Sequence, residues 1–440
     1  MANPDDTTIL GEDFIDTVTP AAPAPPRADV RIPTDAPDRL VFFFSGFDPK
    51  SATFYHRLFR SGIAQRNAAH DETLALGKRH RIGRWASVWT TLWRGASSAL
   101  GGRPVSMRTR VHFMRWDDIV RRHWRRAPMT LARDYWNVYA GGLASGVLRR
   151  IWRVAPAAFW LATFPLIVCA LSLAAGVLVV GVLMWLAGLA SVATAVALGL
   201  VVGTLGWRLV ARSVDCEWLL RLYAFVRQQA LGQVPALDAR LDEMAARLVE
   251  AVEARMRHPG AAPLKEVLVV GYSSGTIMAA SVLARAMPRL ADILGSRRAN
   301  KATSLGMMTL GQCIPIAVEW PGAGRMRNEL DLLAESPLLT WHDYSAASDS
   351  AAFSNVPPWP EPAQLKGRQA SPPFKTMGAM QFAAMRRGRR ELHLQYLRAA
   401  RDRSDAQAYD FFMLACGPQT LAERHAQCES SSELRHKAFV

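Results

Sequence analysis

The sequence predicts an α/β fold, a mostly parallel sheet with helices on both faces, interrupted by a two-helix hydrophobic hairpin. Two observations predict it. Short apolar runs typical of buried strands alternate with longer stretches of helical periodicity. A run of 54 residues without any charge, residues 154–207, divides the chain. With 440 residues, half of them hydrophobic, the chain can bury a sizeable core around both features.

Five short runs are the expected strands. Leu40–Ser45 is apolar and ends at Gly46, which is typical of a strand buried on both faces. Arg110–Trp116 alternates in part between apolar and polar residues. The remaining strands are expected after the uncharged run, at Glu266–Val270, Ser304–Leu310 and Leu338–Tyr344. Because helical stretches separate them, these strands predict a mostly parallel sheet.

Helical periodicity fills most of the segments between these strands. Apolar residues recur at helical spacing over Cys216–Met256, and Thr276–Leu290 follows a strand directly. A last helix is expected over about Met380–Arg401. The proline-rich stretch Pro357–Pro373 predicts a surface loop.

The uncharged run is too long for one buried helix and fits two membrane spans with a tight turn. We place these helices near Ala157–Val179 and Trp185–Trp207. Tryptophans lie near the ends that would face water, where indole rings concentrate at membrane interfaces. The alternative is a buried helical pair in a soluble protein.

The net charge of +16 lies mostly in one segment. Lys78–Arg153 holds 17 Lys and Arg against three acids, a net +14, directly before the uncharged run. Arginines also follow that run, so both outer ends are basic and the positive-inside rule places the soluble parts in the cytoplasm. The basic flank would meet anionic headgroups of a bilayer. Nucleic acid is the rival partner, but the sequence has no finger spacing or recognisable nucleic-acid motif.

The five cysteines are scattered and contain no CxxC pair, so neither a zinc site nor a disulfide framework is indicated. This usage fits a reducing compartment. The acidic N-terminal segment lacks the apolar core of a signal peptide. The expected organisation is a disordered N-terminal segment (1–37), the first part of the α/β domain with its basic segment (38–150), the hairpin (151–210), the second part of the α/β domain (211–427) and a flexible tail (428–440).

The segment with most chemical content is VLVVGYSSGTIMAASVLA, in which Gly271, Tyr272, Ser273, Ser274 and Gly275 join a strand to a helix. A serine at such a turn is held on strained backbone with its hydroxyl above the sheet, and small flanking residues avoid clashes. This segment resembles the nucleophile elbow of the α/β-hydrolase superfamily. Over most of residues 40–424, the chain is similar to uncharacterised bacterial membrane-anchored hydrolase-like proteins.

The elbow also predicts an oxyanion hole. The amide of Ser274 opens the helix and can stabilise negative charge on the substrate oxygen. A second amide is expected from the loop after an earlier strand, and Phe47, next to Gly46, fits that place. The sequence here departs from the HGGG loop of lipases.

A serine nucleophile needs a base, and the base needs an orienting acid. The resemblance implies the chain order serine, acid, histidine. Of the histidines after Ser273, we choose His393, because it lies beyond the last expected strand and beside apolar residues. For the acid, Asp349 lies in the loop a few residues past the strand, whereas Asp343 lies at the strand end. Asp349 is preferred, and Asp343 remains the alternative.

These features predict a serine hydrolase of the inner (cytoplasmic) membrane of a bacterium, with two transmembrane helices and its hydrolase domain in the cytoplasm. It would act as a carboxylesterase, lipase or thioesterase on a small amphiphilic or lipid-like ester, with no metal or organic cofactor. The alternative is a catalytically inactive membrane scaffold with the same fold, which binds a protein partner or anionic lipid.

Overall fold

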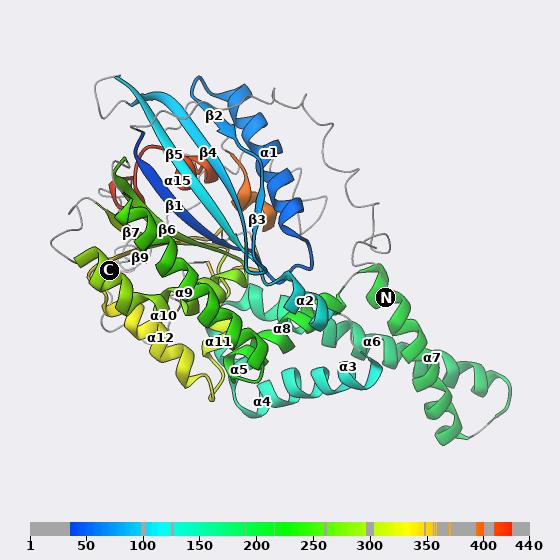
Figure 1. Ribbon diagram of the computed structural model, residues 1–440. Coiled ribbons are helices and arrows are strands. Elements are labelled where there is room, and N and C mark those ends of the chain that lie inside the picture. Colours follow the sequence, from blue (N-terminus) through cyan, green and yellow to red (C-terminus); the bar gives the residue numbers. More distant parts are fainter. Residues whose placement is uncertain are drawn as a thin grey trace, which may run out of the picture.

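The computed structural model of the chain consists of a mixed β-sheet, the helices that cover it and a long helical hairpin (Figure 1). The residues that it describes are 36–97, 103–124, 127–189, 191–214, 216–258, 262–295, 303–346, 349–354, 356, 358, 369–370, 393–399 and 409–424.

Within these residues, nine strands form one sheet in the order β2-β4-β5-β1-β6-β7-β8-β9, with β3 also paired to β4. The neighbours from β5 through β1 to β9 are parallel, whereas β2, β3 and β5 each pair with β4 in antiparallel orientation. The strands are β1 (Asp38–Phe44), β2 (Thr73–Leu76), β3 (His80–Ile82), β4 (Ala86–Ser97), β5 (Arg103–Met114), β6 (Leu264–Tyr272), β7 (Ser304–Leu310), β8 (Leu339–Tyr344) and β9 (Gln369–Ala370). The predicted α/β class with a mostly parallel sheet is confirmed.

Each face of the sheet has its own hydrophobic core, and β1 contributes to both. Phe42 and Phe44 point into one core and Val41 and Phe43 into the other, because successive side chains of a strand alternate. The helices that contribute to the first core include α8 (Glu217–Ala230), α9 (Pro235–Arg257), α10 (Gly275–Gly295), α11 (Ile314–Val318) and α12 (Gly324–Glu335). Those that contribute to the second include α1 (Ala52–Ala69), α15 (Phe411–Cys416) and α16 (Leu421–Arg424).

The expected strands are all present, but the prediction missed β4 and most of β5. The predicted strand Arg110–Trp116 is the end of the much longer β5, which forms an antiparallel ribbon with β4. The basic segment therefore divides into two parts. Its first part forms β3, β4 and β5, and its second part forms helices α2 (Asp117–Trp124), α3 (Pro128–Tyr135), α4 (Gly141–Ala144) and α5 (Val147–Val154). Arginines within β4 and β5 hide the strand pattern, because these strands carry charge on partly exposed positions.

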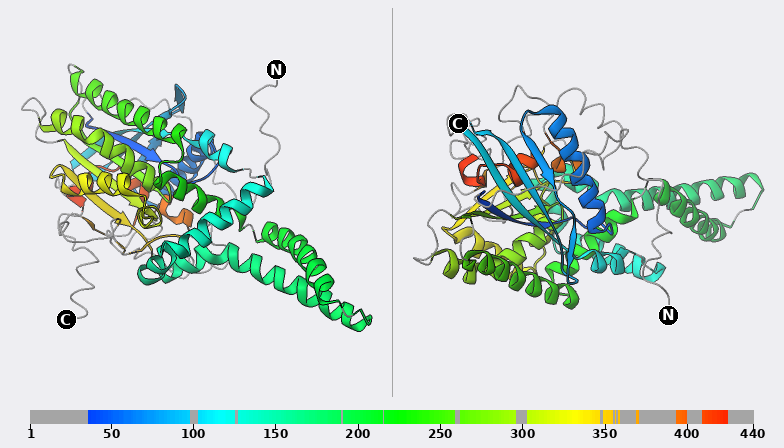
Figure 2. Two further views of the ribbon diagram at one scale, coloured as in Figure 1. Left: turned by 90° about the horizontal axis from the view of Figure 1, so that it is seen from below. Right: turned by 45° about the horizontal axis from the view of Figure 1, so that its top comes forward.

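Helices α6 (Pro156–Leu186) and α7 (Val192–Ser213) form a hairpin that projects away from the sheet (Figure 2). Both are long and apolar enough to cross a membrane, and only 6% and 11% of their most apolar windows are buried. Their backbones approach closely where Gly176 meets Gly199 and Gly203, since a Cβ on Gly176 would overlap backbone atoms of α7. Small residues at such a crossing are typical of helix pairs in lipid.

The predicted boundaries of the hairpin helices need correction. The predicted turn after Val179 is wrong, because α6 continues to Leu186 and α7 begins at Val192 rather than at Trp185. An apolar run without a charge or a proline near its middle gives no signal for the turn. The first helix instead ends just before Gly188, whose φ of +71° lies in the left-handed region that glycine adopts readily.

The sequence after β8 lies largely outside the described residues. Of the predicted loop Pro357–Pro373, the structure describes residue 358 and the short strand β9. Of the predicted helix Met380–Arg401, it describes residues 393–399, which include the 3₁₀ turn Gln395–Leu397.

Candidate active site

Ser273 lies between the end of β6 and the start of α10, at the carboxyl edge of the parallel strands. Its φ is +56°, and it is the one non-glycine residue with positive φ in the described part of the chain. The conformation is held by backbone contacts, because Ser273 N–H donates to the Leu310 carbonyl (2.8 Å) and its own carbonyl accepts from Thr276 N–H (3.0 Å). Strain of this kind concentrates at functional sites.

The glycines of this turn are required by close approach. A Cβ on Gly275 would overlap the carbonyl oxygens of Phe44 and Ser45, and one on Gly271 would lie 2.5 Å from Thr276 Cα. The loop after β1 is as close, because a Cβ on Gly46 would lie 3.0 Å from Ser273 Cβ and 3.3 Å from its Oγ. The β1 loop therefore lies directly against the serine.

The structure joins Asp349 to His393. Asp349 Oδ2 and His393 Nδ1 are 2.7 Å apart, and Asp349 is 4% exposed. Asp349 Oδ1 also accepts from the Ala351 amide (2.9 Å), and the Tyr396 hydroxyl hydrogen-bonds the carboxylate. Burial by itself raises the pKa of Asp349, but the His393 imidazole and these hydrogen bonds outweigh burial and lower it. The carboxylate is therefore ionised and holds the imidazole by Nδ1.

The other ring nitrogen of His393 is buried and has no hydrogen-bond partner among the described residues, Ser273 included. His393 nevertheless lies beside the serine turn. Its ring is 5.1 Å from that of Tyr272, the residue before Ser273, and its carbonyl accepts from the Tyr272 hydroxyl (3.2 Å). In enzymes without substrate, catalytic hydrogen bonds are often long, so this geometry is compatible with a general base.

Asp343 has a different environment. Its two carboxylate oxygens accept from the hydroxyls of Thr309 (2.7 Å) and Ser345 (2.8 Å), and the residue is 1% exposed. These contacts tie the ends of β7 and β8 together. Of the two candidate acids, Asp349 is thus the one that contacts His393, and the contacts of Asp343 are those of a structural residue.

Of the two predicted oxyanion amides, that of Ser274 lies at this turn and that of Phe47 lies in the adjacent β1 loop. The Phe47 amide already has a hydrogen-bond partner. The Phe47 amide donates to Ser274 Oγ at 2.6 Å, a buried hydrogen bond between the β1 loop and the start of α10. The Phe47 ring packs on Phe225 of α8 (5.0 Å) and Trp124 of α2 (5.7 Å). A substrate oxygen could accept from this amide only by displacing or sharing the Ser274 hydroxyl.

Sequence reasoning missed the role of Tyr396. Its hydroxyl accepts from the Ala346 amide (2.9 Å) and also bonds Asp349, so it fixes the loop that carries the acid. Its position three residues after His393 was the available signal, because i and i+3 side chains share a face of a helical turn. The hydrogen-bonding role of the Ser274 side chain was also missed, since only its amide was considered.

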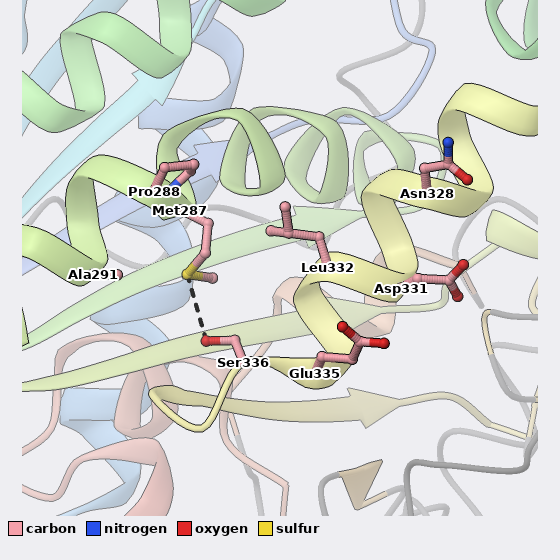
Figure 3. A pocket seen from close by; sticks show the side chains of 8 residues that line it. All are labelled: Met287, Pro288, Ala291, Asn328, Asp331, Leu332, Glu335 and Ser336. Carbon is pink, nitrogen blue, oxygen red and sulfur yellow. Dashed lines mark hydrogen bonds between the residues drawn. The ribbon is translucent and has the colours of Figure 1, made fainter.

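Two further observations concern metal ligands and the location of the main groove. Within the described residues, no group of three or more His, Cys, Asp or Glu side chains could hold a metal ion. A groove of about 540 Å³ lies between α10 and α12 (Figure 3), where Met287 Sδ accepts from the Ser336 hydroxyl (3.6 Å). Because Met287 is 14 residues along the chain from Ser273, on the order of 20 Å at helical rise, this groove is separate from the serine turn.

Comparison with family models, with curated proteins and with solved structures found no match to this chain. The function of this chain must therefore be inferred from the geometry of its site.

Proposed function

We propose that the chain is a membrane-anchored serine hydrolase of the α/β-hydrolase superfamily that cleaves an ester or thioester through an acyl-enzyme on Ser273. The observation that carries the proposal is the strained Ser273 beside an Asp349–His393 pair, whose second imidazole nitrogen is buried and has no hydrogen-bond partner among the residues that the structure describes. A structural histidine in a core usually has both nitrogens satisfied. The chain order of serine, acid and histidine agrees with that superfamily.

The reaction follows from these positions. Ser273 Oγ attacks the carbonyl carbon while His393 Nε2 takes the hydroxyl proton, and Asp349 stabilises the imidazolium through Nδ1–H. The amide of Ser274 donates to the oxyanion, with Phe47 N–H as the second donor once it is released from the Ser274 hydroxyl. His393 then protonates the leaving group. Water, deprotonated by the same nitrogen, attacks the acyl-enzyme and releases the acid.

The hairpin supports a location at the inner membrane with the hydrolase domain in the cytoplasm. Exposed arginines flank it, Arg149 and Arg153 before α6 and Arg208 and Arg212 at the end of α7. The positive-inside rule places such ends on the cytoplasmic side. A substrate that partitions into the bilayer, an amphiphilic or lipid-like ester, suits a site held there. A C-terminal reporter active only in the periplasm would contradict this orientation.

A fluorophosphonate probe tests the activity, because it reacts covalently with activated serines. The full-length chain in native membranes should be labelled, Ser273→Ala should not, and Ser61→Ala, which removes an exposed hydroxyl on α1, should label as the wild type does. Folding of each variant is checked by its circular dichroism in detergent. A folded wild type that stays unlabelled would favour the inactive scaffold, which the engaged Phe47 amide also favours.

A further inference from the structure

A helical rod before the hairpin exposes large apolar side chains and buries a charged one, the reverse of what is expected for a protein in water. The rod consists of α3, the π-helical turn Trp136–Ala140 and α4, which follow one another without a break. Met129, Trp136 and Leu143 are 81%, 72% and 73% exposed, whereas Asp134 on the same rod is 2% exposed. An exposed apolar face of this kind marks an interaction surface.

The inner face of the rod crosses the base of the hairpin. The Tyr139 hydroxyl donates to the Ala162 carbonyl (2.9 Å) and the Tyr135 hydroxyl to the Pro165 carbonyl (3.3 Å), both in α6. The Tyr135 ring also packs on Trp207 of α7 at 5.8 Å. Figure 1 shows α3 and α4 at the end of the molecule from which the hairpin projects. The rod is thus fixed to both hairpin helices at one level.

The length of α6 identifies that level. Its 31 residues span about 46 Å, whereas the hydrocarbon core of a bilayer is about 30 Å thick. The excess corresponds to about 10 residues, which is the stretch from the start of α6 to Pro165 that the rod contacts. This stretch therefore lies in the headgroup region, and the rod lies there with it. Arg133 on the exposed face of the rod and the exposed Arg149 and Arg153 of α5 suit anionic headgroups.

We propose that the outward face of this rod, formed by Met129, Trp136 and Leu143, lies in the headgroup region of the cytoplasmic leaflet as a third membrane contact beside the two hairpin helices. The inference rests on the proposed placement of the hairpin in a bilayer. Interfacial helices bury their apolar side by about 5–10 Å, which large side chains such as these can reach. The partner is the lipid surface itself.

This contact also reaches the candidate active site. Trp124, at the end of α2 and just before the rod, packs on Phe47 in the loop that lies against Ser273. The rod therefore holds the carboxyl edge of the sheet close to the leaflet surface. An ester whose acyl chain stays in the bilayer could then reach Ser273 with only its head region leaving the membrane.

Tryptophan quenching by brominated phosphatidylcholine tests the proposal on the full-length chain in vesicles of phosphatidylcholine and phosphatidylglycerol. The fluorescence difference between wild type and Trp136→Phe isolates the signal of Trp136. Bromines near the carbonyl end of the acyl chain should quench this signal more strongly than bromines near the chain terminus, because the rod lies shallow. Trp185→Phe reports the hairpin in the same way, and Trp93→Phe reports the end of the sheet far from the rod, because Trp93 of β4 pairs with Met107 near the amino end of β1, where no quenching is expected.

The three differences separate the possible outcomes. Quenching of Trp136 and Trp185 but not of Trp93 supports the proposal. Quenching of Trp185 alone would overturn it while leaving the membrane hairpin intact, and would show that protein or water covers the rod. If Trp185 is not quenched either, the placement of the hairpin is wrong, and the inference about the rod falls with it. None of these readings depends on hydrolase activity.

Discussion

Strands β1 and β6 hold buried polar groups of opposite character at their two ends. At the amino ends, Arg39 Nε and Glu266 Oε2 form an ion pair at 2.6 Å, and both side chains are 0% exposed. Arg39 also donates to backbone carbonyls of the C-terminal segment, at Leu414, Gly417 and Gln419, and Glu266 Oε1 accepts from the Leu421 amide (2.8 Å). This end attaches the C-terminal segment to the sheet.

Near the carboxyl ends of the same strands, the polar side chains are fixed in position but keep hydrogen-bonding capacity that no described residue satisfies. Ser273 is strained, and His393 has a carboxylate on one nitrogen and no partner among the described residues on the other. Buried charges that are paired with each other make the fold sensitive to loss of either partner, whereas an oriented group with a free hydrogen-bonding position is available to a substrate. If this is right, substitutions at the two ends should affect different quantities.

The largest expected effect is on turnover at the carboxyl end. Asp349→Asn should lower kcat by about 10⁴-fold, because an amide cannot hold the imidazole in the tautomer that presents a free Nε2 to Ser273. Hydrolysis of a water-soluble p-nitrophenyl ester measures this loss. Asp343→Asn is the matched control and should keep kcat near the wild-type value, while losing about 1–3 kcal/mol of stability with its hydroxyl contacts. The reverse pattern would make Asp343 the catalytic acid.

At the amino end, the expected effect is on stability. Glu266→Gln leaves the Arg39 guanidinium buried without its counter-charge, which should cost about 3–5 kcal/mol of unfolding free energy. Urea unfolding in detergent micelles measures this loss, and kcat per folded molecule should not change. The double variant Arg39→Met/Glu266→Leu removes both charges and should recover much of the loss. A fall in kcat at full stability would contradict the division between the two ends.

The sequence predicted the parallel strands and the serine turn well, because local patterns determine both. An apolar run such as Leu40–Ser45 is buried whichever neighbours it packs against. The glycines around Ser273 are required by contacts with residues close in sequence and with one neighbouring loop. The choice of Asp349 and His393 depended on chain order and on their positions after the last expected strand. The structure adds their contact, which joins residues 44 positions apart.

The features that the sequence did not predict depend on contacts between residues far apart in the chain. The turn of the hairpin has no charge to mark it, and the structure places it at Gly188, whose φ of +71° ends the first helix. The antiparallel ribbon of β4 and β5 was hidden by its arginines. The bond between Phe47 and Ser274 joins residues 227 positions apart, and no local pattern indicates it.

His112 on β5 tests whether an unsatisfied nitrogen is enough to mark a site. It is 5% exposed and stacks on Phe42, and neither ring nitrogen has a hydrogen-bond partner in the described part of the chain. Burial, aided by Arg110, lowers its pKa from 6.5 to about 3. No described carboxylate bonds its ring, so we expect His112 to affect stability and not turnover.

The sign of this effect is fixed by the lowered pKa. Below pH 6.5 the unfolded chain is protonated at His112, whereas the folded chain stays neutral there until about pH 3. The free energy of unfolding therefore decreases as the pH falls through this window. Between pH 7 and pH 5 the wild type should lose about 2 kcal/mol more than His112→Phe, measured by urea unfolding at both values. Equal losses in the two proteins would show that His112 is protonated when folded.

The smallest effect is expected at Ser274, whose hydroxyl occupies the Phe47 amide. Ser274→Ala frees that amide for the substrate oxygen, and a hydrogen bond of about 0.5–1.5 kcal/mol predicts a rise in kcat/KM of at most about tenfold. Ser274→Thr, which keeps the hydroxyl, should stay near the wild type. A loss beyond tenfold in Ser274→Ala would mean that the hydroxyl itself serves the reaction. An unchanged rate would mean that Phe47 is no oxyanion donor, which leaves Ser274 N–H as the remaining predicted donor.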